Sequence, residues 1–115
     1  MDRLTNFFKI LSDETRLRIM VLLFHRELCV CQLTGITGIS QPNVSKHLAR
    51  LRDMGLVKDE RKEQYTFYSL NIQDKVFKDI LEKVVENVDS YPVLKLDIEK
   101  SKAAAKYMEL ASKGK

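Results

Sequence analysis

The feature that most constrains the fold is the run GISQPNVSKHLARLRDMGLV, residues 38–57, which predicts one helix with both of its ends marked. Ser40 stands where a helix N-cap is expected, and Pro42 follows in the first turn, where a missing N–H costs nothing. Apolar residues then recur on one face until Gly55 ends the pattern. Residues 40–52 include three cations and no acid, so the helix is basic as well as amphipathic.

Other hydrophobic patterns place this helix among further helices and one hairpin. Apolar periodicity predicts a first helix ending near Leu11, Ser12 as the cap of the next, and helices over residues 13–25, 29–36, 72–88 and 94–111. The β-prone segments 56–59 and 65–70 predict two strands, with the polar RKEQ between them as the hairpin tip. This order predicts a mainly α fold with a small β-hairpin wing, the winged helix-turn-helix.

A basic helix followed directly by a hairpin is the arrangement that reads double-stranded DNA in such folds, with the first turn of the helix leading into the major groove. The expected contacts are Ser40, Gln41, Asn43, Ser45, Lys46, His47 and Arg50 on the helix, and Arg61, Lys62 and Gln64 on the hairpin. His47 is the weakest of these, because a lone histidine near an apolar side more often packs. The alternative is a protein-interaction module whose basic helix is only solvated, and steep salt dependence of DNA binding separates the two.

The cysteines Cys29 and Cys31 stand one residue apart, and the chain has no others. In a reducing compartment they stay thiols, available as ligands or redox groups. Positions i and i+2 of an ideal helix lie about 200° apart, so both sulfurs cannot face one ion unless the helix start is distorted. The alternative is that two small side chains pack in the core and bind nothing.

The runs ILSDETRLRIMVLL, ELCVCQL, ISQPNVSKHLARLRDMGLV and QYTFYSL together resemble the ArsR/SmtB family of metal- and metalloid-responsive repressors, over roughly residues 7–88. The resemblance implies a homodimeric repressor that binds an operator and releases it when an inducer binds. It implies that Cys29 and Cys31 take the inducer, which would be trivalent arsenic, methylarsenite or antimony, with no cofactor required for folding. A thiol redox switch on the same fold stays open as the alternative.

The chain also departs from the pattern of that family. Trivalent-metalloid members often have a third cysteine shortly after the pair, where this chain has Thr34, so hydroxide, a small thiol or a methyl group would complete the arsenic. Cadmium and lead members add N-terminal cysteines, which are absent here. Zinc-responsive members use histidine with carboxylates on the fifth helix, where this chain has no histidine but only the carboxylates of Asp74, Asp79, Glu82 and Glu86.

The resemblance further implies a dimer built by the N- and C-terminal helices, which agrees with the apolar stripe of the fifth helix. The expected interface residues are Leu4, Phe7, Phe8, Phe77, Ile80, Leu81, Val84 and Val88. Burial of that stripe within one subunit is an equal alternative. We expect residues 1–90 to form the DNA-binding and dimerisation domain, and residues 91–115 to be a C-terminal helical extension of the same domain.

The sequence contains no set of residues typical of an enzyme active site. The histidines His25 and His47 fall on different predicted helices, and no Gly-rich phosphate loop or paired-carboxylate motif occurs. The N-terminus lacks the apolar region of a secretion signal, and the longest apolar run, residues 19–24, is too short to span a bilayer. We therefore expect a cytoplasmic protein with no membrane partner that performs no catalysis.

Overall fold

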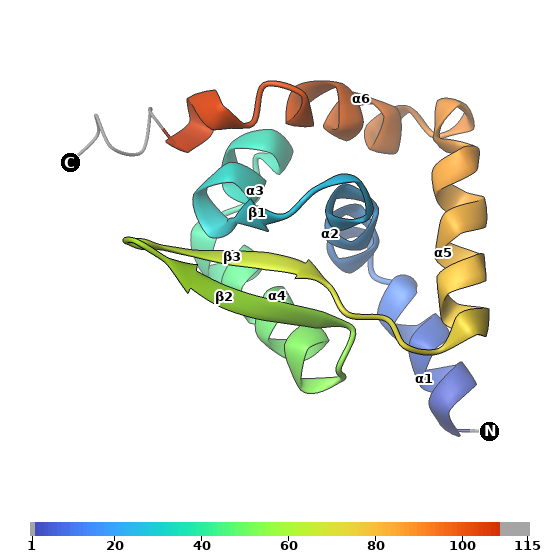
Figure 1. Ribbon diagram of the computed structural model, residues 1–115. Helices are drawn as coiled ribbons and strands as arrows, with labels where there is room; N and C mark the ends of the chain where they lie inside the picture. Colours follow the sequence, from blue (N-terminus) through green and yellow to red (C-terminus); the bar gives the residue numbers. More distant parts are fainter. Residues whose placement is uncertain (1, 109–115) are drawn as a thin grey trace.

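A computed structural model describes residues 2–108 of the chain and contains six helices, a short 3-10 turn and a three-stranded sheet (Figure 1). The elements in chain order are α1 (Asp2–Leu11), α2 (Glu14–His25), β1 (Leu28–Cys29), α3 (Val30–Thr37), α4 (Gln41–Asp53), β2 (Val57–Lys62), β3 (Tyr65–Leu70), α5 (Lys75–Glu86), η1 (Val88–Ser90) and α6 (Pro92–Ser101). This arrangement confirms the predicted mainly α fold with a hairpin wing. No helix within residues 2–108 is long and apolar enough to cross a membrane.

Helix α2 lies at the centre of the core. Five consecutive residues, 19–23, are buried, so the helix has apolar contacts around most of its circumference. Its N-cap is Asp13, whose carboxylate accepts the backbone N–H of Arg16 at 3.0 Å. That hydrogen bond lowers the pKa of Asp13. The predicted cap, Ser12, is wrong by one residue, because its hydroxyl donates back to the carbonyl of Lys9 and belongs to the end of α1.

The sheet contains a strand that local sequence patterns did not predict. Strand β1 pairs with β3 in antiparallel fashion, with Leu28 opposite Tyr68 and Cys29 opposite Phe67. Cys29 is extended, at φ −91° and ψ 171°, and serves as the N-cap of α3. The expected helix start at Cys29 is therefore wrong by one residue, because pairing with β3 holds that residue outside the helix.

The β2–β3 hairpin forms the wing, which extends past the helices in Figure 1. Lys62 is opposite Tyr65, which leaves a loop of only Glu63 and Gln64. The predicted RKEQ tip is therefore too long, since Arg61 and Lys62 belong to β2. Two-residue loops are favoured in hairpins because their twist matches that of the strands. Glu63 has a φ of 58°, the left-handed conformation that such a loop requires.

Glycine ends the two helices that form the helix-turn-helix. Gly38 adopts φ 75° after α3, and Gly55 adopts φ 76° just beyond α4, so both provide the left-handed residue with which many helices end. A third glycine of this region, Gly35, lies inside α3. Helix α5 begins at Lys75, later than predicted, because the carboxylate of Asp74 accepts the backbone N–H of the second residue of the helix at 2.9 Å.

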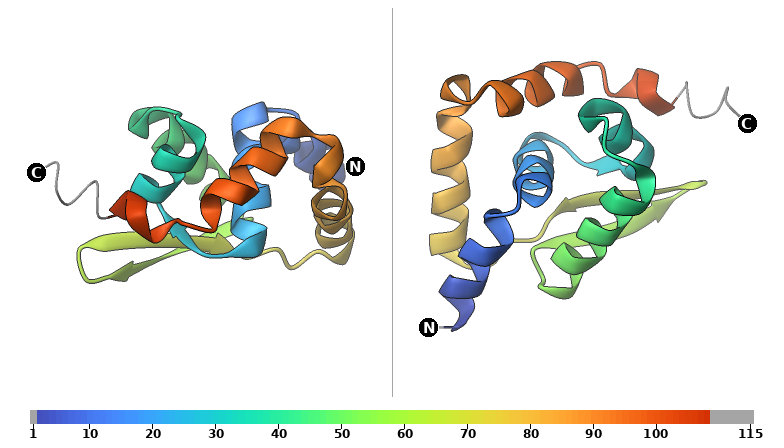
Figure 2. Two further views of the ribbon diagram at one scale, coloured as in Figure 1. Left: turned by 90° about the horizontal axis from the view of Figure 1, so that it is seen from above. Right: turned by 180° about the vertical axis from the view of Figure 1, so that it is seen from behind.

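The C-terminal part of the chain crosses over α2 and α3 (Figure 2). Helix α6 begins at Pro92 rather than at the predicted residue 94, and a turn separates it from further helical residues at 105–108. Residues 109–111 of the predicted last helix, and the tail after them, lie outside the described residues. The C-terminal segment, residues 91–108, therefore covers α3, the helix that begins directly after Cys29.

Candidate DNA interface and thiol pair

Helix α4 packs one face on the core and leaves the opposite face open. Val44, Leu48 and Leu51 are fully buried, while the residues of the first turn are exposed. The Ser40 side chain makes no capping hydrogen bond, so its hydroxyl and the free N–H groups of the first turn are available to an anion. A helix start of this kind is suited to a DNA phosphate.

The structure places most of the expected DNA contacts together on that open face. Ser40, Gln41, Asn43, Ser45, Lys46 and Arg50 are all exposed. Within residues 2–108, neither Lys46 nor Arg50 has an ion-pair partner, whereas Arg52 is paired with Asp59 at 3.3 Å. Two cations of α4 are thus free to neutralise phosphate charge, and the third is not.

His47 does not share this exposed surface. Only 14% of its side chain is exposed, with Nε2 at 3.9 Å from the Asp13 carboxylate and Nδ1 at 3.4 Å from the Arg16 guanidinium. Burial lowers the pKa of His47, although the nearby Asp13 opposes the change. His47 is therefore less accessible to DNA than its neighbours on α4, because its ring lies between α4 and the start of α2.

The expected DNA contacts on the wing differ in whether their side chains already bind another group of the protein. Arg61 is exposed and donates from Nε to the carbonyl of Glu63 at 3.1 Å, and Gln64 is exposed in the loop. Lys62 instead pairs with Glu27 and lies over the ring of Phe67 at 5.5 Å. Of the three expected wing contacts, Arg61 and Gln64 thus make no ion pair within residues 2–108, while Lys62 is already paired with Glu27.

The thiols of Cys29 and Cys31 meet at the start of α3. Their Sγ atoms are 2.8 Å apart, with Cys29 buried and Cys31 half-buried. The expectation that the helix must be distorted to bring both sulfurs together is wrong, because Cys29 precedes the helix and approaches from β1. Extended backbone at an N-cap removes the angular separation that two helical residues would have.

The surroundings of Cys31 favour its neutral thiol. Burial, together with the contact from Cys29, raises the pKa of the Cys31 thiol to about 11. The backbone N–H of Cys29 donates to Oε1 of Gln32 at 3.0 Å, a contact that sequence reasoning missed. The Thr34 hydroxyl is buried and has no hydrogen-bond partner among residues 2–108.

Residues 2–108 contain no group of three or more His, Cys, Asp and Glu side chains placed to hold a metal ion. Three of the carboxylates considered for zinc on the fifth helix have other partners: Asp74 pairs with Arg3, Asp79 with Lys75, and Glu86 with Lys83.

The expected interface residues fall into two groups. Phe7, Phe77 and Leu81 are buried within the subunit, and the first two stack with ring centroids 4.2 Å apart, so their assignment to an interface is corrected. Phe8 is 51% exposed, and the remaining expected residues, Leu4, Ile80, Val84 and Val88, are half-buried.

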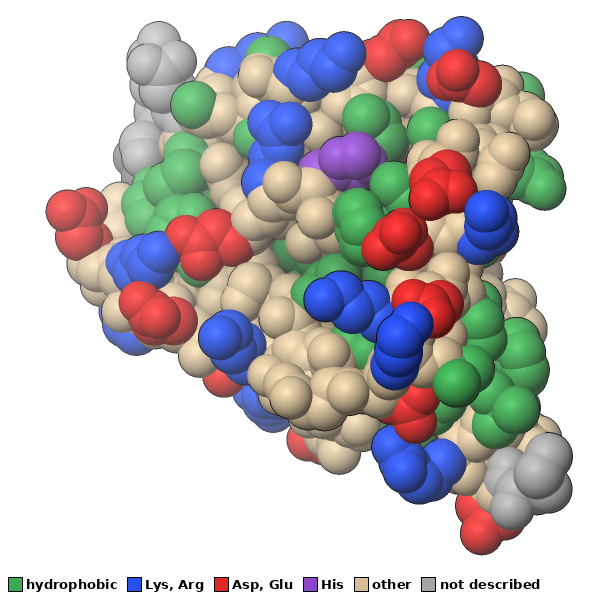
Figure 3. Space-filling view, turned by 45° about the vertical axis from the view of Figure 1, so that its right-hand side comes forward, with side chains coloured by type: hydrophobic (Ala, Val, Ile, Leu, Met, Phe, Trp, Pro, Cys, Tyr) green, Lys and Arg blue, Asp and Glu red, His purple; other side chains and the backbone are tan. Residues whose placement is uncertain are grey.

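Five further large apolar side chains within residues 2–108 are exposed and were not expected at an interface: Met54, Val76, Tyr91, Val93 and Leu96. Val76 belongs to the stripe of α5 that the sequence shows, and Met54 lies at the end of α4. Val93 and Leu96 lie in α6, and Tyr91 directly precedes that helix. Figure 3 shows an apolar area beside the N-terminal end of the chain, bordered by acidic and basic side chains. A surface of this kind typically marks a contact with another protein.

Comparison with known proteins places this geometry in a family. The profile described as "Bacterial regulatory protein, arsR family" matches residues 13–59. The arsenic resistance transcriptional regulator ArsR1 of Pseudomonas putida is 48% identical over 65 residues, which are 56% of this chain and 51% of that protein. The arsenical resistance operon repressor of Escherichia coli is 49% identical over 65 residues, 56% of each chain. The chain thus spans about half the length of these curated relatives.

The fold has a close counterpart among solved structures. HlyU from Vibrio cholerae superimposes with a TM-score of 0.67 at 31% sequence identity, covering 78% of this chain and 92% of that one. The superposition therefore covers more of the chain than the segment 13–59 that the sequence profile matches.

Proposed function

Because the chain belongs to the ArsR family of bacterial regulatory proteins, we propose that it is a homodimeric DNA-binding repressor that releases its operator when a trivalent arsenical binds Cys29 and Cys31. One observation carries this proposal: the two thiols lie 2.8 Å apart at the start of α3, the helix that leads directly into the DNA-facing α4. The printed names of the P. putida and E. coli relatives support arsenic as the inducer.

The donor set fits a trivalent arsenical better than a divalent metal. Arsenite can condense with two thiols, As(OH)₃ + 2 RSH → (RS)₂AsOH + 2 H₂O, which forms two As–S bonds and leaves one hydroxide on arsenic. The reaction needs two sulfurs, and the chain has two. A cadmium site with four sulfurs would need a partner subunit, since one chain cannot provide them.

Binding would act on α4 through α3. Two sulfurs that share one central atom at bonds of ~2.3 Å must lie ~3.3 Å or more apart, so the present 2.8 Å has to widen. The movement would displace the first turn of α3 from β1. Only the turn around Gly38 separates α3 from α4, and the two helices pack together, so α4 would tilt on the DNA.

The direct test is a fluorescence anisotropy titration of the protein on a DNA fragment from its own promoter. We expect arsenite to release the bound DNA and magnesium at equal concentration to have no effect, because Mg²⁺ prefers oxygen ligands. A protein that stays on its promoter at saturating arsenite, methylarsenite and antimonite would contradict the proposed inducer class.

A pH series separates arsenite from cadmium at the thiol pair. Because the pKa of Cys31 is raised to about 11, its thiol keeps its proton at pH 6–8 and must lose it to bind cadmium. Cadmium affinity should therefore rise at least ~10-fold per pH unit through this residue alone. Arsenite affinity should stay nearly constant, because the condensation releases water and no protons. Isothermal titration calorimetry at pH 6, 7 and 8 measures both, and parallel pH dependence of the two would contradict the condensation.

A thiol redox switch is the second candidate function. The 2.8 Å separation favours it, because little movement would close a disulfide. The raised pKa of Cys31 opposes it, because thiolate is the form that attacks oxidants. Titration of the DNA complex with hydrogen peroxide and with arsenite distinguishes the two, since a redox switch releases DNA with the oxidant at lower concentration.

The proposed dimer gives a further prediction. Replacing Phe8 by Asp should weaken dimerisation by about 100-fold, because an exposed ring that would be buried in the dimer becomes a charge. Sedimentation velocity measures the dimer fraction, and Gln64→Asp in the wing is the matched control for the added charge. If Phe8→Asp dimerises like the control, the α1 surface is not the interface.

A further inference from the structure

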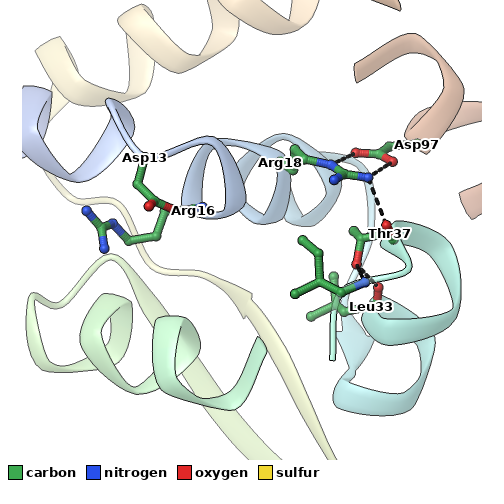
Figure 4. Close-up of polar contacts among 7 residues, drawn as sticks. Asp13, Arg16, Arg18, Leu33, Thr37 and Asp97 are labelled. Carbon is green, nitrogen blue, oxygen red and sulfur yellow. Dashed lines mark hydrogen bonds and ion pairs between the residues drawn. The ribbon is translucent and has the colours of Figure 1, made fainter. Parts of the chain in front are cut away.

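The C-terminal segment, residues 91–108, contacts α3 along its whole length. At one end, the Arg18 guanidinium binds both carboxylate oxygens of Asp97, at 2.8 and 2.9 Å, and donates to the carbonyl of Thr37 at 3.1 Å (Figure 4). In the middle, the ring of Tyr107 lies against Gly35 so closely that a Cβ there would be 2.1 Å from Cδ1. The partners that the segment itself provides, Asp97 and Tyr107, lie outside residues 13–59, to which the family profile is matched.

Gln32 connects this segment to the thiol pair at the other end of α3. Its side chain is 6% exposed; Oε1 accepts the backbone N–H of Cys29 at 3.0 Å, and Nε2 donates to the carbonyl of Ala104 at 3.2 Å. One buried amide thus satisfies a donor of the first cysteine and an acceptor of the C-terminal segment. Cys29, Gln32 and Ala104 are all buried, so losing the amide would leave both backbone groups unpaired.

We propose that Gln32 is a positioning residue of the thiol pair and that the C-terminal segment holds it in place. Cys29 reaches Cys31 only while its backbone is extended and outside α3, and the hydrogen bond to Gln32 stabilises that state. Without that hydrogen bond only the pairing with β3 keeps Cys29 outside the helix, so conformations in which Cys29 joins α3 and the two sulfurs point ~200° apart become more populated. The inference extends the proposed function, because it assigns part of the inducer site to residues far along the chain.

The first test replaces Gln32 by Met, which has a similar length and no hydrogen-bonding group. Arsenite affinity should fall ~10-fold, the order expected when a buried hydrogen bond is lost. Operator affinity without arsenite should stay within about twofold, because the α4 surface is untouched. Gln73→Met, at an exposed residue before α5, is the matched control and should behave like wild type.

A second variant acts on the same segment from Gly35, which lies three residues after Gln32 in α3. Gly35→Ala forces the Tyr107 ring away, while alanine itself favours the helix, so α3 remains folded. It should also weaken arsenite binding, and it should add little to Gln32→Met, because both changes break the same connection. If the double variant loses arsenite affinity by the product of the two single factors, the segment does not act through Gln32.

A readout without arsenic keeps this inference separate from the proposed inducer. In a glutathione buffer the pair can form its disulfide, 2 RSH + GSSG → RSSR + 2 GSH, with the two thiols oxidised and glutathione reduced. Gln32→Met should lower this equilibrium constant by a factor similar to its effect on arsenite. If wild type does not respond to arsenite but Gln32→Met still lowers the disulfide equilibrium constant, the proposed inducer is wrong and Gln32 still positions the thiol pair. Values within about twofold of wild type in both assays would overturn that role.

Discussion

Replacing Cys29 and Cys31 together by Ser is expected to abolish arsenite-induced release while operator affinity stays within about twofold of wild type. A hydroxyl has nearly the shape of a thiol but is a hard donor, so the condensation that forms As–S bonds has no counterpart. The pair lies away from the open face of α4, and Cys29 meets the wing strand β3 through backbone pairing with Phe67, which serine keeps, so DNA binding itself should persist. The concentration of arsenite that releases half of the DNA should rise by at least ~100-fold.

Single variants sharpen this experiment. Cys31→Ser should behave like the double variant, because one sulfur cannot chelate, and its half-buried position makes it the milder change for stability. Thermal unfolding and operator affinity without inducer control for damage to the fold. Release of the double variant at the wild-type concentration of arsenite would show that the inducer binds elsewhere.

Raising salt from 50 to 200 mM is expected to weaken operator binding ~1,000-fold. The free cations Lys46, Arg50 and Arg61 would contact about six phosphates in a dimer, and each contact contributes about −0.9 to the slope of log affinity against log salt. The expected slope is therefore about −5.4. Anisotropy titrations at four salt concentrations measure it.

Removing one of these cations gives the matched test. Lys46→Ala takes away two phosphate contacts per dimer and should reduce the slope to about −3.6. Lys95→Ala makes the same change of charge on the exposed surface of α6, away from α4, and should leave the slope unchanged. A slope near zero for wild type would instead favour a protein-interaction module whose basic helix is only solvated.

The helix that carries the DNA-facing residues could be predicted because its signals are local. Ser40, Pro42 and Gly55 each determine backbone conformation within one turn, and the structure places the helix between them. Exposure of Lys46 and Arg50 follows from the same periodicity. His47 could not be placed this way, because its partners come from the start of α2.

The thiol geometry depends on residues that are distant in sequence. Strand β1 has two residues and exists through its pairing with β3, so no local pattern marks it. The burial of Phe7 likewise results from stacking on Phe77, which periodicity along either helix cannot reveal. The C-terminal contact did leave a signal in the sequence. Asp97 lies one turn after the apolar Leu94, so it falls on the core-facing side of α6, where an acid indicates a buried partner.

The ion pair between Arg18 and Asp97 has a consequence for the order in which the protein is made. Its partners are 79 residues apart, and those of the Gln32–Ala104 hydrogen bond are 72 apart, whereas α3 and α4 are neighbours in the chain. Local contacts close early and distant ones late, and a chain emerging from the ribosome presents its N-terminal residues first. The DNA-facing helices can therefore associate before the residues that position the thiols have been synthesised. A chain that ends prematurely would retain its DNA-facing elements and lose the support of its sensing site.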